Sequence, residues 1–279
     1  MQNQRKYDAT HGRVMVAELS KLMDCVREKS PLVHHITNYV TVNDCANICI
    51  CSGGSPVMTD EVKDVQDMSR IANAVVLNMG TLNQRTVEAM LLAGNVAKKN
   101  GIPVVFDAVG AGATPYRNEV AARIIEKVKP EILKGNAGEI SFLAGVAGGV
   151  KGVDSVSTAD DIRGLVLGLA RKYGCIVVAT GKKDYVSDGK DVYVLMNGSD
   201  YQGTVSGTGC MLSSVIGAYV GANGAKVCAV MAAITAFNVA AEHAESVCKG
   251  PGSFKVSLFD CLYNLDSMEM AKEARIEKA

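Results

Sequence analysis

Short apolar runs, rich in β-branched residues, alternate with longer segments of helical periodicity along most of the chain. Three runs are apolar almost throughout, as expected for strands buried on both faces of a parallel sheet: residues 74–79, 103–108 and 175–180. Between them, segments 84–99 and 158–173 carry apolar residues three or four positions apart, which predicts amphipathic helices. Thr158 and Asp161 resemble a capping box at the start of the second helix.

The last third of the chain has a different pattern. Residues 185–195 predict a β-hairpin, because Asp188 and Gly189 supply a two-residue turn between two runs of strand-forming residues. Helices are predicted after it: residues 210–220, 226–247 and, as one helix or a pair, 254–277. Together with a helix expected from Val40, these elements predict an α/β fold with a mixed, mainly parallel central sheet flanked by helices.

The 279 residues are interpreted as a single domain. Hydrophobic residues make up 48% and charged residues 21%, and no linker or low-complexity tract marks a boundary. Residues 1–12 are expected to form a polar, poorly ordered extension with no secretion signal. The most apolar stretch, 227–241, is rich in Ala and shorter than the ~20 residues of a bilayer span, which predicts a buried core helix.

Charge and cysteine content narrow the choice of partners. Lys+Arg and Asp+Glu both number 29, and this balance argues against nucleic acid or an anionic membrane as the main partner. A near-neutral protein is also compatible with homo-oligomer formation. The nine cysteines lack the spacing of a zinc site or a disulfide framework, so most are interpreted as small buried side chains in a reducing compartment.

Ligands of open parallel sheets bind beyond the carboxyl ends of the strands, so the polar residues there are the candidates for chemistry. Asp107 closes a buried run in FDAVGAG, where a carboxylate can hold Mg²⁺ near phosphates, although a helix cap or turn residue would look the same. In LKGNAGEI, Lys134 and Asn136 end a short strand and Glu139 opens the next helix, a position that suits phosphate or a hydrated metal. First-turn Glu residues are also common simply because they complement the helix dipole.

The segment 204–212, TVSGTGCML, places two glycines before a long apolar helix. Glycines allow backbone N–H groups to converge on an anion, but the segment is neither a dinucleotide fingerprint nor a P-loop. Cys210 begins the helix, where the positive end of the dipole would lower the pKa of an exposed thiol. A buried cysteine packed under the turn is the competing interpretation. His34 and His35 are adjacent and would face opposite sides of a strand, so joint metal binding is not expected.

Taken together, these segments resemble hydroxyethylthiazole kinases, thiamin-salvage enzymes of the ribokinase-like superfamily. The resemblance covers residues 32–265, and its most specific motifs occur in family order: HHITNYVTVNDCAN, GGSPVM, NMGTL, FDAVGAGATPYR, KGNAGEI and SGTGCML. It implies a ribokinase-like three-layer sandwich and transfer of phosphate from ATP, with Mg²⁺, to the primary alcohol of 4-methyl-5-(2-hydroxyethyl)thiazole. It also implies a cytoplasmic homotrimer with active sites between subunits.

The resemblance assigns roles to individual positions. It implies metal binding by Asp107 and Glu139, ATP contacts by Lys134 and Thr180, thiazole contacts by Met58 and Gly207, an anion hole over Gly207, Thr208, Gly209 and Cys210, and a catalytic role for Cys210. Lys134 stands where the family usually has Arg, which keeps the charge but loses the bidentate fork. Two alternatives stay open: a ribokinase-like kinase acting on a sugar or a hydroxymethylpyrimidine, and a non-catalytic nucleotide-binding or redox-sensing protein.

Overall fold

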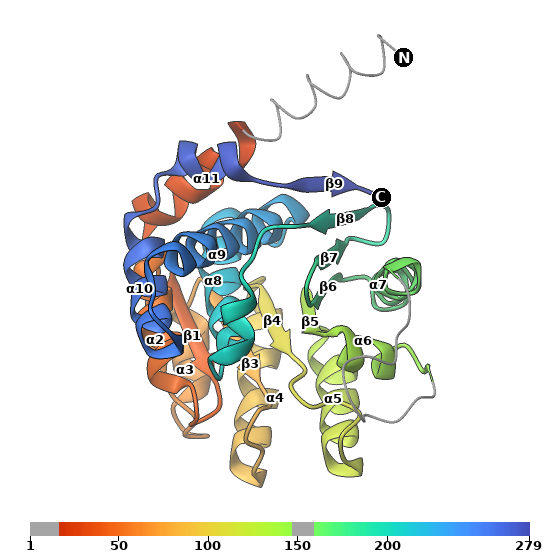
Figure 1. Ribbon diagram of the computed structural model, residues 1–279. Helices are drawn as coiled ribbons and strands as arrows, with labels where there is room; N and C mark the ends of the chain where they lie inside the picture. The colour runs from red at the N-terminus through yellow and green to blue at the C-terminus, as the bar shows by residue number, and fades with distance from the viewer. Residues whose placement is uncertain (1–16, 147–158) are drawn as a thin grey trace.

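The computed structural model describes residues 17–146 and 159–279, and within them nine strands form one sheet in the order β2-β1-β3-β4-β5-β6-β7-β8-β9 (Figure 1). From β2 to β6 neighbouring strands are parallel, and β7, β8 and β9 complete the sheet with antiparallel pairs. The strands are β1 (Leu32–Ile36), β2 (Ser55–Met58), β3 (Ala74–Asn78), β4 (Val104–Asp107), β5 (Ile132–Asn136), β6 (Ile176–Thr180), β7 (Asp184–Ser187), β8 (Val192–Leu195) and β9 (Ile276–Lys278).

Helices cover both faces of the sheet and create two separate hydrophobic cores. One core packs under a helix over residues 17–29 and under α2 (Val42–Cys51), α8 (Thr208–Asn223), α9 (Val227–Val247), α10 (Pro251–Asn264) and α11 (Ser267–Glu273). The other lies under α3 (Val65–Ile71), α4 (Gln84–Lys99), α5 (Pro115–Val128), α6 (Ala137–Leu143) and α7 (Ala159–Tyr173). A short 3-10 helix, η1 (Asp200–Thr204), precedes α8. The three-layer α/β architecture predicted from the sequence is confirmed.

Alternation along the strands decides which strand-end residues meet α8. Val76, Val105 and Ile132 point into the α8 core, so the residues two positions later point the same way. These residues are the last of β3, the last of β4 and the third of β5. In the sheet register Asn78 lies opposite Asp107, and Asp107 lies opposite Lys134. Three polar side chains are thereby aligned in one row beneath the start of α8.

Most predicted elements are confirmed with small shifts at their ends. Segment 84–99 is helical at the predicted bounds, and β7 and β8 form the predicted antiparallel hairpin. The expected capping box at Thr158 and the N-terminal extension 1–12 lie outside the described residues. The prediction of helix up to residue 277 is wrong at its end, because β9 pairs with β8 at the sheet edge. β9 has only three residues, IEK, and two are charged, so no strand pattern was visible.

α9 is the buried core helix that its composition predicts. It is the one helix of the described part whose length and apolar composition would suffice for a membrane span. Every residue from 229 to 241 is nevertheless buried inside the protein. A helix that is apolar on all sides is expected where other helices surround it, and α8 and α10 pack on α9.

Candidate active site

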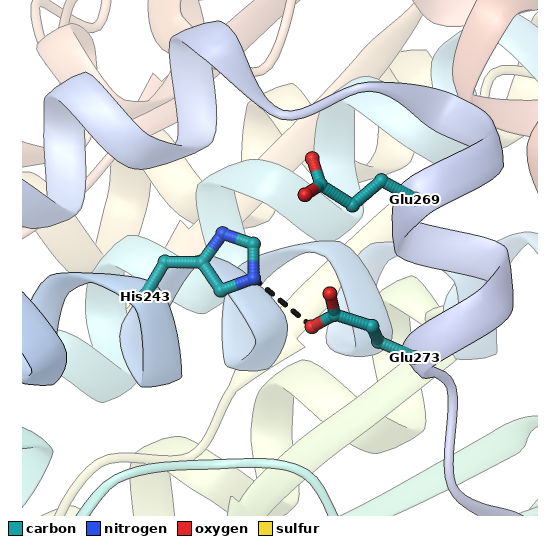
Figure 2. A group of neighbouring side chains, drawn as sticks. All are labelled: His243, Glu269 and Glu273. Carbon is teal, nitrogen blue, oxygen red and sulfur yellow. Dashed lines mark hydrogen bonds and ion pairs between the residues drawn. The ribbon is translucent and has the colours of Figure 1, made fainter.

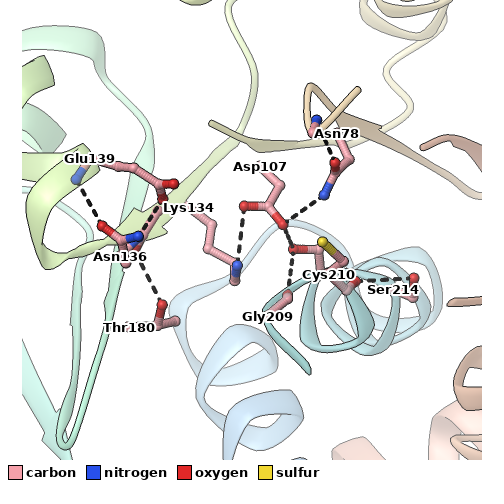
Figure 3. A network of polar contacts seen from close by, with 12 residues as sticks. Asn78, Asp107, Lys134, Asn136, Glu139, Thr180, Gly209, Cys210 and Ser214 are labelled. Carbon is pink, nitrogen blue, oxygen red and sulfur yellow. Dashed lines mark hydrogen bonds and ion pairs between the residues drawn. The ribbon is translucent and has the colours of Figure 1, made fainter. Parts of the chain in front are cut away.

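Asp107 is the centre of the polar row at the strand ends (Figure 3). Its Oδ2 accepts hydrogen bonds from Asn78 Nδ2 at 3.0 Å and from Ser213 Oγ at 2.7 Å. Its Oδ1 lies 3.1 Å from Lys134 Nζ, and both side chains of this ion pair are almost completely buried, with 2% and 3% exposed. Residues from β3, β4, β5 and α8 thus share one carboxylate, which ties the sheet to the start of α8.

The environment of Lys134 keeps its side chain charged. Burial by itself would lower the pKa of the Lys134 ammonium group, but the negative charge of Asp107, supported by Cys210 where it is ionised and by Glu139, outweighs it, and the pKa is raised. An added Cβ at Gly209 would lie 3.6 Å from Lys134 Nζ, so the ammonium group borders the glycine turn. A fixed positive charge therefore stands next to the N-terminus of α8.

Glu139 lies in the first turn of α6 and is held by backbone groups. Gly110 N–H donates to its Oε1 at 2.6 Å, and Asn136 N–H donates to its Oε2 at 2.7 Å, while Asn136 Oδ1 caps the Glu139 N–H in return. This is a capping box at the start of α6. Burial raises the pKa of Glu139, and the charge of Asp107 acts in the same direction. The two acids are close enough for each to affect the other's charge.

Gly207 caps α8 with a backbone that only glycine adopts readily, at φ +87°. A Cβ there would come within 2.1 Å of Thr41 Cγ2, so the position lacks space as well as conformational freedom for a side chain. The first-turn N–H groups of Thr208, Gly209 and Cys210 have no partner within the helix and carry the positive end of its dipole. The geometry suits an anion, which was the expectation for residues 207–210.

Cys210 lies within this arrangement, but its expected acidity is corrected. Its Sγ accepts a hydrogen bond from Asn38 Nδ2 at 3.3 Å, and Asn38 also donates to Asn78 Oδ1. Burial raises the pKa of the Cys210 thiol, and the nearby charge of Asp107 raises it further, against the lowering effect of Lys134. The prediction of a lowered pKa is therefore wrong for the free protein, because only the fold brings burial and a carboxylate to this position.

Two cavities lie on either side of the Asp107 row. The larger, of about 610 Å³, is lined by residues at the carboxyl ends of β5 and β6, including Thr180, and by Thr208 and Gly209 at the start of α8. The smaller, of about 280 Å³, is lined by Met58 and Tyr39 near the carboxyl ends of β1 and β2. The structure thus places Thr180 and Met58 in different cavities, and neither Gly207 nor Lys134 is among the residues that line these two cavities.

A buried acid that sequence reasoning missed stands in the wall of the larger cavity. Asp184, at the start of β7, accepts hydrogen bonds from Gly181 N–H at 3.1 Å and from Asn238 Nδ2 at 2.7 Å. Asn238 in turn accepts a bond from Gln202 Nε2 at 3.1 Å. Residues from β7, α9 and η1 are joined in this way around one carboxylate. Burial raises the pKa of Asp184 to about 6, although both hydrogen bonds lower it.

We expect Asp184 to make folding stability fall as pH rises from about 4 to 6. Its pKa is higher in the folded protein than the usual 3.8, so the folded state holds the proton more tightly in this window. The contribution lost is of the order of 3 kcal/mol, from about two pKa units. Urea unfolding of the wild type and of Asp184→Asn at several pH values measures it. The difference between the two proteins should change between pH 4 and 6 and stay level above; a constant difference would contradict the assignment.

Other members of the site were also missed as individual residues. Asn78 ends the apolar run of β3 as Asp107 ends that of β4, so the strand-end rule could have found it. Ser213 and Asn238 gave no such signal, because they lie in helices and reach the site only through packing.

The histidine pair behaves as predicted. His34 Nδ1 lies 3.0 Å from Ser69 Oγ of α3 on one side of β1, whereas His35 Nδ1 lies 3.0 Å from the Val33 carbonyl oxygen. Burial lowers the pKa of both rings, that of His35 to about 4.

Fold and site together define a class of protein. A solved structure of a ribokinase-like superfamily protein from Enterococcus faecalis superposes with a TM-score of 0.63, covering 83% of this chain and 86% of that one at 11% identity. The arrangement of one central sheet between two layers of helices is thus a ribokinase-like α/β fold.

The particular family follows from closer similarities. The family model for the hydroxyethylthiazole kinase family matches residues 23–268, and the chain belongs to this family. The hydroxyethylthiazole kinase of Methanocorpusculum labreanum is 48% identical over 259 residues, which is 93% of this chain and 98% of that protein. The solved structure of a hydroxyethylthiazole kinase protein from Pyrococcus horikoshii is 37% identical with a TM-score of 0.87, covering 94% of this chain and 98% of that one.

Proposed function

We propose that the protein phosphorylates the primary alcohol of 4-methyl-5-(2-hydroxyethyl)thiazole with ATP, a reaction of thiamin salvage. Membership of the kinase family supports this. The observation that carries it is the buried Asp107–Lys134 pair beside the glycine turn of α8, located between two cavities of unequal size. Such a site can bring a phosphate and an alcohol together at one charged centre.

The volumes favour one assignment of the cavities. A nucleoside triphosphate needs the cavity of about 610 Å³, where Thr180 would contact it and the phosphates would extend toward Lys134. The cavity of about 280 Å³ suits a single heterocycle, with Met58 in its wall. The transferring phosphoryl group would then lie at Gly207 to Cys210, where helical N–H groups and Lys134 can neutralise its charge.

The two acids differ in how freely they could bind Mg²⁺. Both oxygens of Asp107 already accept bonds from side chains, including the cation Lys134, whereas each oxygen of Glu139 accepts one bond from a backbone N–H and keeps a lone pair. The raised pKa of Glu139 also means that a nearby cation would favour its ionised form. Glu139 would therefore hold Mg²⁺, which neutralises phosphate charge when bound, and Asp107 would act mainly by orienting Lys134 and Ser213.

Cys210 is proposed to orient the substrate hydroxyl for in-line attack. The pKa of its thiol is raised, so the side chain is protonated at neutral pH, and Asn38 fixes the sulfur by a hydrogen bond. If Cys210 acted as a general base, kcat would instead rise about tenfold per pH unit at pH values below the thiol pKa. An orienting thiol gives a nearly flat profile from pH 7 to 9.

We expect Cys210→Ser to lower kcat by about 10²-fold, because the shorter hydroxyl misplaces the alcohol, and to leave the affinity for ATP nearly unchanged. Steady-state kinetics with ATP and hydroxyethylthiazole measure both quantities. Unchanged turnover would remove Cys210 from the mechanism, and a steep pH dependence of the wild-type kcat would restore the role of base.

The substrate assignment is tested with a panel of alcohols, ATP and Mg²⁺. Hydroxyethylthiazole should give the highest kcat/KM. Preference for a sugar or a hydroxymethylpyrimidine would support the other ribokinase-like kinase function, and binding of ATP without turnover of any alcohol would support a non-catalytic protein.

A homotrimer in the cytoplasm is proposed as well. Tyr39 and Val40, 78% and 59% exposed, form an apolar rim next to the smaller cavity, as expected where a neighbouring subunit covers the site. The nine free cysteines are compatible with a reducing compartment. Sedimentation of an active monomer would contradict the shared site.

A further inference from the structure

Three side chains of types that can bind a metal ion gather where α11 packs on α9. His243 comes from α9, and Glu269 and Glu273 come from α11, as Figure 2 shows. One ligand atom from each residue lies within 4.8 Å of the other two. His243 Nε2 and Glu273 Oε2 are 2.9 Å apart. The three groups point toward a common space between the two helices.

The local fold explains why the groups converge. Glu269 and Glu273 are four residues apart, and so they lie on one side of α11. Met270 and Ala271 are buried in the core, which fixes the rotation of the helix. Asp266 caps α11 by accepting bonds from the N–H groups of Met268 and Glu269. The acids are presented toward α9 by packing that does not depend on a metal.

We propose that His243, Glu269 and Glu273 bind a divalent cation of the zinc class and join α11 to α9. One imidazole nitrogen with two carboxylates is a ligand set for zinc, with water in the fourth position, whereas Mg²⁺ prefers oxygen ligands alone. The cation balances the two carboxylate charges. With ligand bonds of about 2.0–2.2 Å, two donor atoms of a tetrahedral site lie roughly 3.3–3.6 Å apart. The His243 and Glu273 atoms, now 2.9 Å apart, would therefore separate slightly to admit the ion, which rotation of the Glu side chain allows.

Space and access agree with this assignment. A cavity of about 240 Å³ is lined by His243 and Glu269, together with Asp260, Cys261 and Asn264 from α10. The His243 side chain is 31% exposed and that of Glu273 is 40% exposed, so an ion can enter from solvent.

The alternative is a simple ion pair between His243 and Glu273, and the two cases differ in the role of Glu269. If only the ion pair exists, Glu269 can be replaced without effect. If the three residues bind a metal, replacing Glu269 removes one of the three ligands. Changing a group that only supports a ligand already costs about 10–100-fold in metal affinity, and loss of a ligand should cost at least as much.

The test uses the full-length protein after treatment with a chelator. Excess Mg²⁺ is present to occupy the proposed Mg²⁺ site at Glu139. Zn²⁺ is titrated against a chromophoric chelator, and the thermal midpoint Tm is measured with and without Zn²⁺, for the wild type, Glu269→Gln and the control Glu277→Gln. The control removes an exposed acid from the neighbouring β9. All three proteins keep the nine cysteines, so thiol binding cancels in the comparison.

We expect the wild type and Glu277→Gln to bind one more equivalent of Zn²⁺ than Glu269→Gln and to gain Tm with the metal. Without metal the three Tm values should agree closely. Equal stoichiometry and an equal Tm gain in Glu269→Gln would overturn the site and leave the ion pair alone. Because neither measurement involves phosphate transfer, the outcome is independent of the proposed kinase function.

Discussion

Replacing Lys134 with Met should lower the free energy of unfolding by about 3–5 kcal/mol and reduce kcat/KM by at least about 10²-fold. The loss of stability arises because Asp107, only 2% exposed, would keep its buried charge without the cation that compensates it. The loss of activity arises because the ammonium group next to Gly209 is the fixed positive charge at the glycine turn. Urea unfolding and steady-state kinetics measure the two effects.

Two further variants separate the causes. In Lys134→Met combined with Asp107→Asn, both charges are removed, so most of the stability should return while turnover stays low. Lys98→Met is the matched control, because Lys98 pairs with Glu131 in a partly exposed salt bridge, and it should cost less than about 1 kcal/mol. If Lys134→Met cost no more than Lys98→Met, the buried pair would not be the stabilising feature described here.

Replacing Gly207 with Ala should be almost as damaging, although it adds a single methyl group. The residue would have to keep a left-handed backbone, at a cost of about 1–2 kcal/mol, and its Cβ would be forced against Thr41 Cγ2, at a further cost of about 1–3 kcal/mol. Displacement of the first turn of α8 should also lower kcat by about 10²-fold. Unfolding and kinetic measurements on the same protein check both expectations.

The other end of α8 offers a control for Gly207→Ala. Gly224 also has a positive φ, +79°, and its ψ of 165° lies in a region almost exclusive to glycine, so alanine there costs at least as much conformational free energy as at Gly207. A Cβ at Gly224 would meet nothing within 4 Å, so Gly224→Ala should nevertheless keep full activity. Adding Thr41→Ser to Gly207→Ala removes the clashing methyl group and should recover part of kcat. An equal kcat for Gly207→Ala and Gly224→Ala would show that the contact with Thr41 is unimportant.

Much of the fold could be predicted because its core elements have strong periodic patterns. Strands such as Ala74–Asn78 are buried on both faces and therefore apolar throughout, and Gln84–Lys99 has one apolar side and a clear end. β9 could not be predicted, because an edge strand of three residues is held by backbone pairing with β8. Its side chains are half-buried or exposed and show no strand pattern.

The candidate site was predictable where it follows strand ends and not where it depends on packing. Asp107, Lys134 and Glu139 were selected from their positions. The structure pairs Asp107 with Lys134 beneath the start of α8, and Glu139, in the first turn of α6, is close enough for its charge to be coupled to theirs. The direction of the Cys210 pKa shift depends on burial and on Asp107, which lies 103 positions earlier in the sequence. Asp184, in β7, was missed because its partner Asn238 belongs to α9 and lies 54 positions away.

The uninterrupted burial of α9 determines how the protein can vary. In a saturation mutagenesis library, α4 should show tolerated positions recurring every three or four residues, since one of its sides faces solvent. Residues 229–241 have no such side, so every position there should be intolerant of substitution. Even replacement of Ala by a larger apolar residue should be selected against. Homologues that diverge widely on the surface are then expected to keep this segment small and closely packed.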